Sequence, residues 1–394
     1  MLPLYQYETH PIPSGAGELR NLELQGAHSG LWFERFFNQY NAEYKVEADA
    51  KKIFLESLTG HLGQGRCGAD ARLKAAYFRQ KSLVQACQGR SLLLHSEGHF
   101  ATGLGNPHPI ENGFLFHPTL AVPYLPGSGV KGLVRSWLER QLGQDEGAKN
   151  LFHRLFGSDD KDPKEVIEET GTGEIIFFDA LPFKPIELLL DTMTPHAGGW
   201  YQKGGGAEAR EAANQPADWH DPNPVCFLAA RNCLLHFSFA PRVQQGDTAQ
   251  LLQLVAKALE QALTHAGAGA KTGAGYGSFR CLSDKEQEEV TRLDRQQETA
   301  LAEQQEAQKL AQLSPQAQRV EALRKLSELP QNQNAGSGAG FFSQLTATLE
   351  EGVDWAKADK QALYQLGKAY QRHVSKKKEK DYKALLNALG VDSA

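Results

Sequence analysis

Cysteine is scarce in this sequence and is not arranged as a disulfide scaffold or a metal site. The 394 residues contain five cysteines, and no two of them form a CxxC pair. Small disulfide-rich domains and cysteine zinc sites both need closely spaced cysteines, so the pattern excludes both classes. We expect reduced, mostly buried thiols and no cofactor. The five are Cys67, Cys87, Cys226, Cys233 and Cys281.

Long apolar runs and a targeting signal are missing as well. No run of about 18 apolar residues, the length that spans a membrane, occurs in the chain. The first residues, MLPLYQYETHPIP, lack the basic flank and the continuous apolar segment of a signal peptide. We therefore expect a cytoplasmic protein with no membrane partner.

An excess of basic residues is also absent. The chain carries 42 Lys and Arg against 47 Asp and Glu, a net charge of −5, and neither residues 1–283 nor residues 284–394 are basic. Affinity for nucleic acid comes from Lys and Arg that replace the counterions of phosphates. Any RNA contact must therefore be local, and we expect the chain to bind RNA weakly unless an assembly shares the strand.

Against these absences stands one motif, PYLPGSGVKGLVRSWL at residues 123–138. A Pro-Gly turn followed by apolar residues at helical spacing predicts a helix with Ser128 as its N-cap. Unpaired N–H groups in the first turn, close approach at the glycines and a nearby lysine are typical of a phosphate site. The alternative is an ordinary turn-helix junction with surface cations. The candidate binding residues are Gly127, Ser128, Gly129, Lys131 and Arg135.

A second motif, GAGAKTGAGYG at residues 267–277, contains five glycines. It is not a P-loop, because GxxxxGK[ST] is missing and the expected helix precedes the motif instead of following it. Such a loop can present N–H groups and one cation to a sugar-phosphate chain, while its tyrosine packs on a sheet or a base. A flexible linker is the alternative. The candidate RNA-binding residues are Gly267, Gly269, Lys271, Thr272, Gly273, Gly275 and Tyr276.

Side-chain exposure and backbone freedom follow from this interpretation. We expect Lys131 and Lys271 to be exposed, so that each neutralises about one phosphate. We expect Gly273 and Gly275 to need glycine, because a Cβ branch would block positive φ and the close approach of a strand.

The two motifs resemble the Pro-Gly-Ser-x-x-Lys-Gly helix and the late Gly-rich loop of the RAMP superfamily of CRISPR systems. Residues 102–125, 177–196 and 216–228 resemble RAMP subunits of type III-B (Cmr) effector complexes, so the match covers most of residues 90–280. The resemblance implies a ferredoxin-like (RRM-like) α+β fold with helical and loop insertions. It also implies an antiviral-defence subunit that caps the complex and holds the 3′ part of the guide RNA and its target duplex. The implied partners are CRISPR guide RNA, target RNA and the other Cmr subunits.

Local patterns divide the chain into two expected domains. Residues 1–283 form the RAMP domain with an N-terminal helical cover over residues 31–44 and 48–58, and residues 284–394 form an all-α extension with a linker near 330–340. The expected helix at 248–265 is amphipathic. An exposed excursion is expected at 158–173. The expected strands are residues 91–95, 114–122, 174–181, 186–193, 224–230, 234–240 and 276–282, with 224–230 and 234–240 forming a hairpin.

Histidines are the candidates for any catalysis, because imidazole suits acid-base work near neutral pH. No spacing among them fixes a metal site, and no nucleophile-base pair can be identified. The resemblance implies that target cutting belongs to another subunit. We expect no enzyme; a metal-independent endoribonuclease and a purely structural adaptor remain open. The histidines are His95, His99, His108, His117, His196 and His220.

Overall fold

The computed structural model describes most of the chain. The described residues are 28–391 except for 38, 62–65, 144, 158–170, 196, 204–205, 207, 212–213, 218–219, 221–223 and 334–339. His196 lies outside the described residues, as do most of the expected excursion at 158–173 and of the linker near 330–340.

The chain divides into two compact units, Met1–Ser283 and Asp284–Ala394. Each unit has its own hydrophobic core. The first unit combines helices with antiparallel sheets, whereas the described part of the second is helical. The expectation of a mixed helix-and-sheet protein is confirmed.

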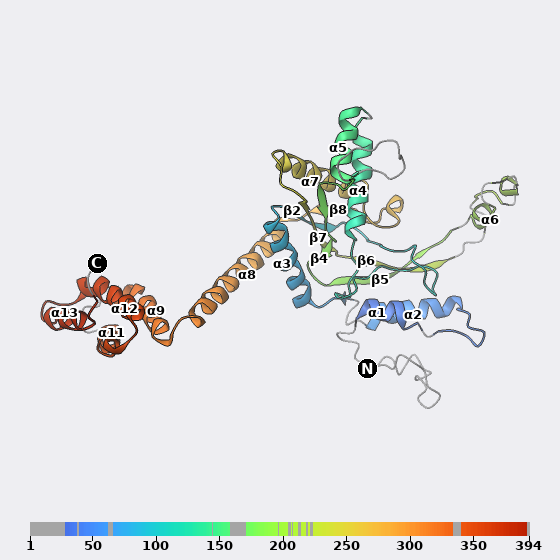
Figure 1. The fold of residues 1–394 in the computed structure, drawn as a ribbon. Coiled ribbons are helices and arrows are strands. Elements are labelled where there is room, and N and C mark those ends of the chain that lie inside the picture. Colours follow the sequence, from blue (N-terminus) through green and yellow to red (C-terminus); the bar gives the residue numbers. More distant parts are fainter. Residues whose placement is uncertain are drawn as a thin grey trace. The chain divides into compact units, whose positions relative to one another are not determined.

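A five-stranded antiparallel sheet organises the first unit (Figure 1). Its strand order is β3-β7-β2-β8, and β4 also pairs with β7. Every residue of β7 is buried, so both faces of this strand are covered. The strands are β2 (Arg90–Ser96), β3 (Ile175–Phe177), β4 (Leu181–Pro182), β7 (Leu234–Pro241) and β8 (Phe279–Cys281).

Helices cover the two faces of this sheet. On one face, Tyr77 and Gln80 of α3 (Asp70–Ala86) contact His236 of β7. On the other face, α7 (Thr248–His265) contacts β2, β7 and β8 and packs beside α4 (Gly127–Gln141). Helix α7 matches its predicted bounds, because its apolar residues recur every three to four positions and point into the core. Helix α5 (Glu146–Phe156) follows α4.

A second, three-stranded sheet has the order β1-β5-β6. It consists of β1 (Arg66–Cys67), β5 (Ile186–Met193) and β6 (Val225–Arg231), and α2 (Ala48–His61) packs on β5 and β6. Two short helices, α1 (Ser29–Arg35) and α6 (Gly198–Gln202), complete the unit.

The predicted hairpin of residues 224–230 and 234–240 is wrong. Strand β6 pairs with β5, whereas β7 pairs with β2, β3 and β4. Asn232, with a φ of 56°, turns the chain from one sheet into the other. The two strands are adjacent in sequence, but their hydrogen-bonding partners are distant in sequence.

Two local predictions in the first unit also fail. Residues 114–122 do not form a strand, and their only pairing in the described chain is an isolated bridge between Phe116 and Pro123. The predicted helix at 31–44 is shorter and ends at Arg35. Phe33, Phe114 and Phe116 are buried, so these aromatic side chains contribute to the core although two of them lie outside regular secondary structure.

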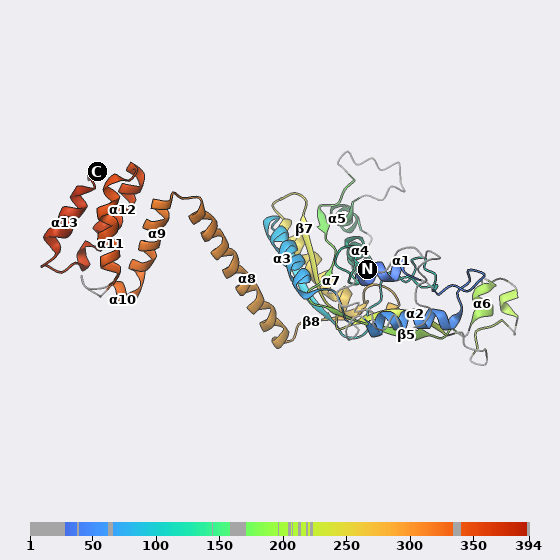
Figure 2. The same ribbon diagram turned by 90° about the horizontal axis from the view of Figure 1, so that it is seen from below.

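The second unit contains six α-helices in its described residues (Figure 2). Its core includes Tyr370 and Tyr382, whose hydroxyls donate hydrogen bonds to the carbonyls of Asn332 at 3.1 Å and Gly367 at 2.9 Å. Pro315 begins a helix behind an N-cap at Ser314. The helices are α8 (Asp284–Ala311), α9 (Pro315–Glu328), α10 (Pro330–Gln333), α11 (Gly340–Glu351), α12 (Lys357–Tyr370) and α13 (Glu379–Ala388).

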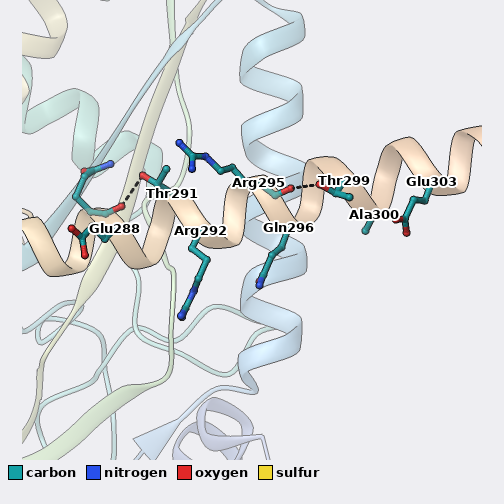
Figure 3. A pocket seen from close by; sticks show the side chains of 9 residues that line it. Glu288, Thr291, Arg292, Arg295, Gln296, Thr299, Ala300 and Glu303 are labelled. Atoms are coloured by element: carbon teal, nitrogen blue, oxygen red, sulfur yellow. Dashed lines mark hydrogen bonds between the residues drawn. The ribbon is translucent and has the colours of Figure 1, made fainter. Parts of the chain in front are cut away.

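A shallow hollow of about 630 Å³ follows one face of α8 (Figure 3). Its lining residues run from Gln287 to Glu303 and all belong to this helix. Because its walls come from one helix, the hollow is the space between neighbouring side chains. The site that the two motifs build lies within the first unit.

Candidate nucleic-acid interface

A groove of about 580 Å³ joins the two motifs that the sequence singles out. One wall is the face of α4 that carries Gly129, Leu133, Trp137 and Arg140, and the other is the end of α7 with residues 265–269 and 272–273. Helices α4 and α7 pack side by side, which brings the Gly-rich loop beside α4. The residues that line this groove include Arg140 and His265 but no Asp or Glu.

The inner part of the Gly-rich loop is fixed against the segment after β2. Ala270 donates a backbone hydrogen bond to Ala101 O at 2.7 Å, and Gly277 donates one to His99 O at 2.7 Å. Gly269 has a φ of +89°, and a Cβ there would lie 2.2 Å from Ala101 O. The loop is therefore held by specific contacts and is not a flexible linker.

The outer part of the loop is open. Residues Thr272–Ala274 form one 3₁₀ turn. A Cβ at Gly273 or at Gly275 would meet nothing within 4 Å, and only Gly275 has a positive φ, of +87°. The expectation that Gly273 needs positive φ is wrong. Its backbone is exposed and lines the groove.

The N-terminus of α4 is capped by a distant carboxylate. The Gly127 N–H donates a hydrogen bond to Asp179 Oδ1 at 2.7 Å. The N-cap residue is Pro126, so the prediction of Ser128 as N-cap is wrong. Gly127 allows a close approach to the end of β3, because a Cβ would lie 2.4 Å from Phe177 O. A phosphate at this terminus would have to replace Asp179 or lie beside it.

Lys131 and Arg135 do not line the groove. Lys131 is half-buried, and its Nζ donates a hydrogen bond to Phe156 O at 2.7 Å. Arg135 Nε donates to Glu139 Oε1 at 2.9 Å. The expectation of an exposed Lys131 is therefore wrong, because its ammonium group caps the last turn of α5.

Lys271 is also half-buried, contrary to the expectation of exposure. It adopts a left-handed backbone conformation with a φ of 60°. Its Nζ lies 4.9 Å from the centroid of the Phe227 ring and 3.3 Å from Met193 Sδ. The ammonium group thus lies on the strands of the second sheet.

Tyr276 ties the end of the loop to the same sheet. Its hydroxyl donates a hydrogen bond to Asp191 Oδ2, and His99 Nδ1 lies 3.1 Å from that oxygen. Burial and the bond to Asp191 raise the pKa of Tyr276 to about 12. Burial opposes ionisation of Asp191, but hydrogen bonds from Tyr276, the Thr192 N–H and His99 keep its pKa below the usual range. Of the two placements left open for Tyr276, the structure has it packed on the sheet.

Eight groove residues were not predicted as binding residues from the sequence: Leu125, Leu133, Ser136, Trp137, Arg140, His265, Ala266 and Ala268. Trp137 and Leu133 are among the apolar residues at helical spacing that predict the helix, and both also line the groove. Arg140 follows Trp137 by three positions, so the two share a face. His265 ends α7. For α4, the sequence does indicate a shared face, because residues 129, 133, 137 and 140 recur at helical spacing. Nothing local indicates that His265 reaches Trp137.

No helix in the described chain is long and apolar enough to cross a membrane. Across the same residues, no group of three or more His, Cys, Asp or Glu side chains is placed to hold a metal ion.

Both motifs lie inside the part of the chain that a family model matches. A family model described as the RAMP superfamily matches residues 61–280, more than half of the chain. The Cmr6 subunit of the Pyrococcus furiosus CRISPR system is 30% identical over 232 residues, which is 46% of this chain and 65% of the relative. The Cmr6 subunit of Saccharolobus solfataricus is 32% identical over 88 residues, 22% of this chain and 26% of the relative. The chain thus spans less than two thirds of either relative.

Solved structures give weaker matches. A type III-B Cmr-beta complex bound to cognate target RNA contains a chain with a TM-score of 0.45 and 19% identity, covering 68% of this chain and 85% of that one. Crystalline Cmr6 from Pyrococcus furiosus has a TM-score of 0.29 and 24% identity, covering 49% of this chain and 98% of that one. By the family match over residues 61–280, the chain belongs to the RAMP superfamily.

Proposed function

We propose that this chain is a Cmr6-type, non-catalytic RNA-binding subunit of a type III-B CRISPR (Cmr) effector complex. In this role it caps the complex and holds the 3′ part of the guide RNA and its target duplex during antiviral defence. Its partners are the guide RNA, the target RNA and the other Cmr subunits. The similarity to two Cmr6 subunits supports the class of complex.

The observation that carries the RNA-binding part is the groove between α4 and the Gly-rich loop. In a chain with a net charge of −5, the groove is lined by one arginine and one histidine and by no carboxylate. Exposed backbone at Gly273 allows a strand to approach closely. Phosphates held by such a groove are few, so its affinity is modest and the strand is shared with neighbouring subunits.

The strand order of the main sheet supports a ferredoxin-like (RRM-like) assignment within this proposal. Strands β2, β3, β7 and β8, taken in sequence order with β4, β5 and β6 inserted between β3 and β7, lie in the sheet order β3-β7-β2-β8. Helices α4 and α5 lie in the connection from β2 to β3, and α7 lies in the connection from β7 to β8. This is the βαββαβ connection of the ferredoxin-like fold.

An endoribonuclease remains the second candidate, because the His99–Asp191 contact has the form of a base oriented by a carboxylate. We favour a structural role for this cluster. Tyr276 keeps its proton at neutral pH with a pKa of about 12, and its hydroxyl is already bound to Asp191. The substitution His99→Ala should leave target-RNA cleavage by the assembled complex near normal. Abolished cleavage in a correctly assembled variant would favour the nuclease.

The proposal is tested by guide-RNA retention in the reconstituted complex. Arg140→Ala should weaken retention, whereas Lys257→Ala, an exposed residue of α7 outside the groove, should not. Removing one cationic phosphate ligand lowers the salt slope of binding by about 0.7 for a single strand. Unchanged retention and slope for Arg140→Ala in an intact complex would favour a structural adaptor.

A further inference from the structure

The groove contains a pair of aromatic rings on two different helices. The indole of Trp137 and the imidazole of His265 have centroids 5.9 Å apart, and their planes are inclined by 20°. Trp137 is half-buried against the core, and its Nε1 donates a hydrogen bond to Gln261 Oε1 at 3.4 Å. The indole is therefore held in place, while His265 is exposed at the end of α7.

We propose that the His265–Trp137 pair is a stacking platform for one unpaired base of the RNA strand, with Arg140 on an adjacent phosphate. This inference rests on the proposed RNA-binding function. It specifies which part of the RNA strand the groove recognises, namely one base and the adjacent phosphate. The base continues the stack on the outer face of the imidazole. Because every base has a π face, the platform accepts all four bases.

The chemistry of the groove favours a base over a simple anion or a protein segment. An anion site would gather cations, but the lining supplies Arg140 and His265 beside apolar groups such as Leu133 and Trp137. A basic protein segment would need carboxylates, and the lining contains none. A single strand offers both a ring and a negative charge, which matches an aromatic pair beside one guanidinium.

Trp137 and Arg140 are three positions apart on α4 and therefore share one face of the helix. The exposed backbone of Gly273 belongs to the opposite wall. A strand in the groove thus meets rings and a cation on one wall and exposed backbone on the other. Lys131 and Lys271, which the sequence suggested as phosphate ligands, are not among the lining residues.

The test separates base stacking from phosphate binding in the full-length protein. Fluorescence anisotropy at fixed low salt compares oligouridine with an abasic ribose-phosphate oligomer of the same length. The wild-type protein should bind oligouridine about tenfold tighter than the abasic oligomer. His265→Leu covers the indole without a π system and should reduce this ratio several-fold, whereas His265→Phe should keep it. Arg140→Ala should weaken both oligomers equally, and Lys257→Ala should change neither.

Equal binding of both oligomers by the wild-type protein, or an unchanged ratio in His265→Leu, would overturn the platform while the RNA-binding function stands. If neither the wild-type protein nor the assembled complex binds either oligomer in the groove, both the RNA-binding function and the stacking platform are wrong. Loss of partner-subunit association in His265→Leu with unchanged RNA affinity would make the groove a protein interface and would also overturn the platform.

Discussion

Replacing Gly269 by alanine should destabilise the first unit for two reasons. The backbone at this position has a positive φ, and the neighbouring Ala101 carbonyl leaves no room for a Cβ. The φ of Gly269 is +89°, and a Cβ would lie 2.2 Å from Ala101 O. A left-handed backbone costs a residue with a Cβ about 1–2 kcal/mol. Pushing Ala101 away also weakens the hydrogen bond from Ala270 N–H at 2.7 Å, worth about 1 kcal/mol.

The two contributions sum to roughly 2–3 kcal/mol. For a domain of this size, the expected fall in Tm is about 4–12 °C. Differential scanning calorimetry of the full chain measures it as a shift of the transition of the first unit. Gly273→Ala is the matched control in the same loop, because its Cβ meets nothing within 4 Å. We expect its effect to be about 0.5 kcal/mol or less.

Substitutions at Gly269 and Gly273 also separate the effect on stability from the effect on RNA binding. Gly273→Val should leave Tm nearly unchanged but weaken RNA binding, because the added side chain occupies the open wall of the groove. Equal Tm values for Gly269→Ala and Gly273→Ala would show that the contact with Ala101 does not hold the loop.

Three further predictions concern contacts outside the groove. Tyr276→Phe removes the hydroxyl bound to Asp191 and should lower the free energy of unfolding by about 1–2 kcal/mol in urea titrations; no change would mean that the loop is not tied there. Lys131→Ala should destabilise by a similar amount, because it removes the hydrogen bond to Phe156 O, but leave the salt slope of RNA binding unchanged; a lower slope would show a phosphate contact. Burial lowers the pKa of His236 from 6.5 to about 4, so the folded state resists a proton that the unfolded state accepts. The stability from neutral His236 is therefore complete above pH 6.5 and is lost as pH falls toward 4, by roughly 3 kcal/mol. Urea midpoints between pH 7 and 4.5 should fall less for His236→Gln than for the wild type, and equal falls would assign the loss to other groups.

Local patterns were sufficient to predict several elements. The helix at 248–265 and the helix after Pro126 follow from apolar spacing and a turn signal, which act within a few residues. The strand at 91–95 was predicted for the same reason and extends over Arg90–Ser96. Pro315 lies at a helix start because proline fits the first helical position.

Contacts between distant residues could not be predicted from local patterns. Asp179 caps α4 from 52 positions away, and this contact places a carboxylate where the sequence suggested a phosphate. Lys131 looked exposed because the carbonyl that it caps lies on the next helix, 25 positions later. Strands β6 and β7 looked like a hairpin because nothing local reveals that their partners belong to different sheets.

The groove likewise combines features that local patterns predict with a contact between distant residues that they do not. Each motif was recognisable by itself, as a turn before a helix and as a loop of glycines. The groove arises only when α7 packs beside α4, so its aromatic pair, Trp137 and His265, comes from residues 128 positions apart.

The most direct test of the central claim is ultraviolet crosslinking of the reconstituted complex, followed by mass spectrometry of RNA-linked peptides. If the groove holds RNA, adducts from this chain should fall in the segment that contains Trp137 and Arg140 and in residues 265–273. Arg140→Ala should reduce them while the complex stays assembled. Adducts confined to other segments of this chain, or none from this chain in a complex that retains its guide RNA, would contradict the account.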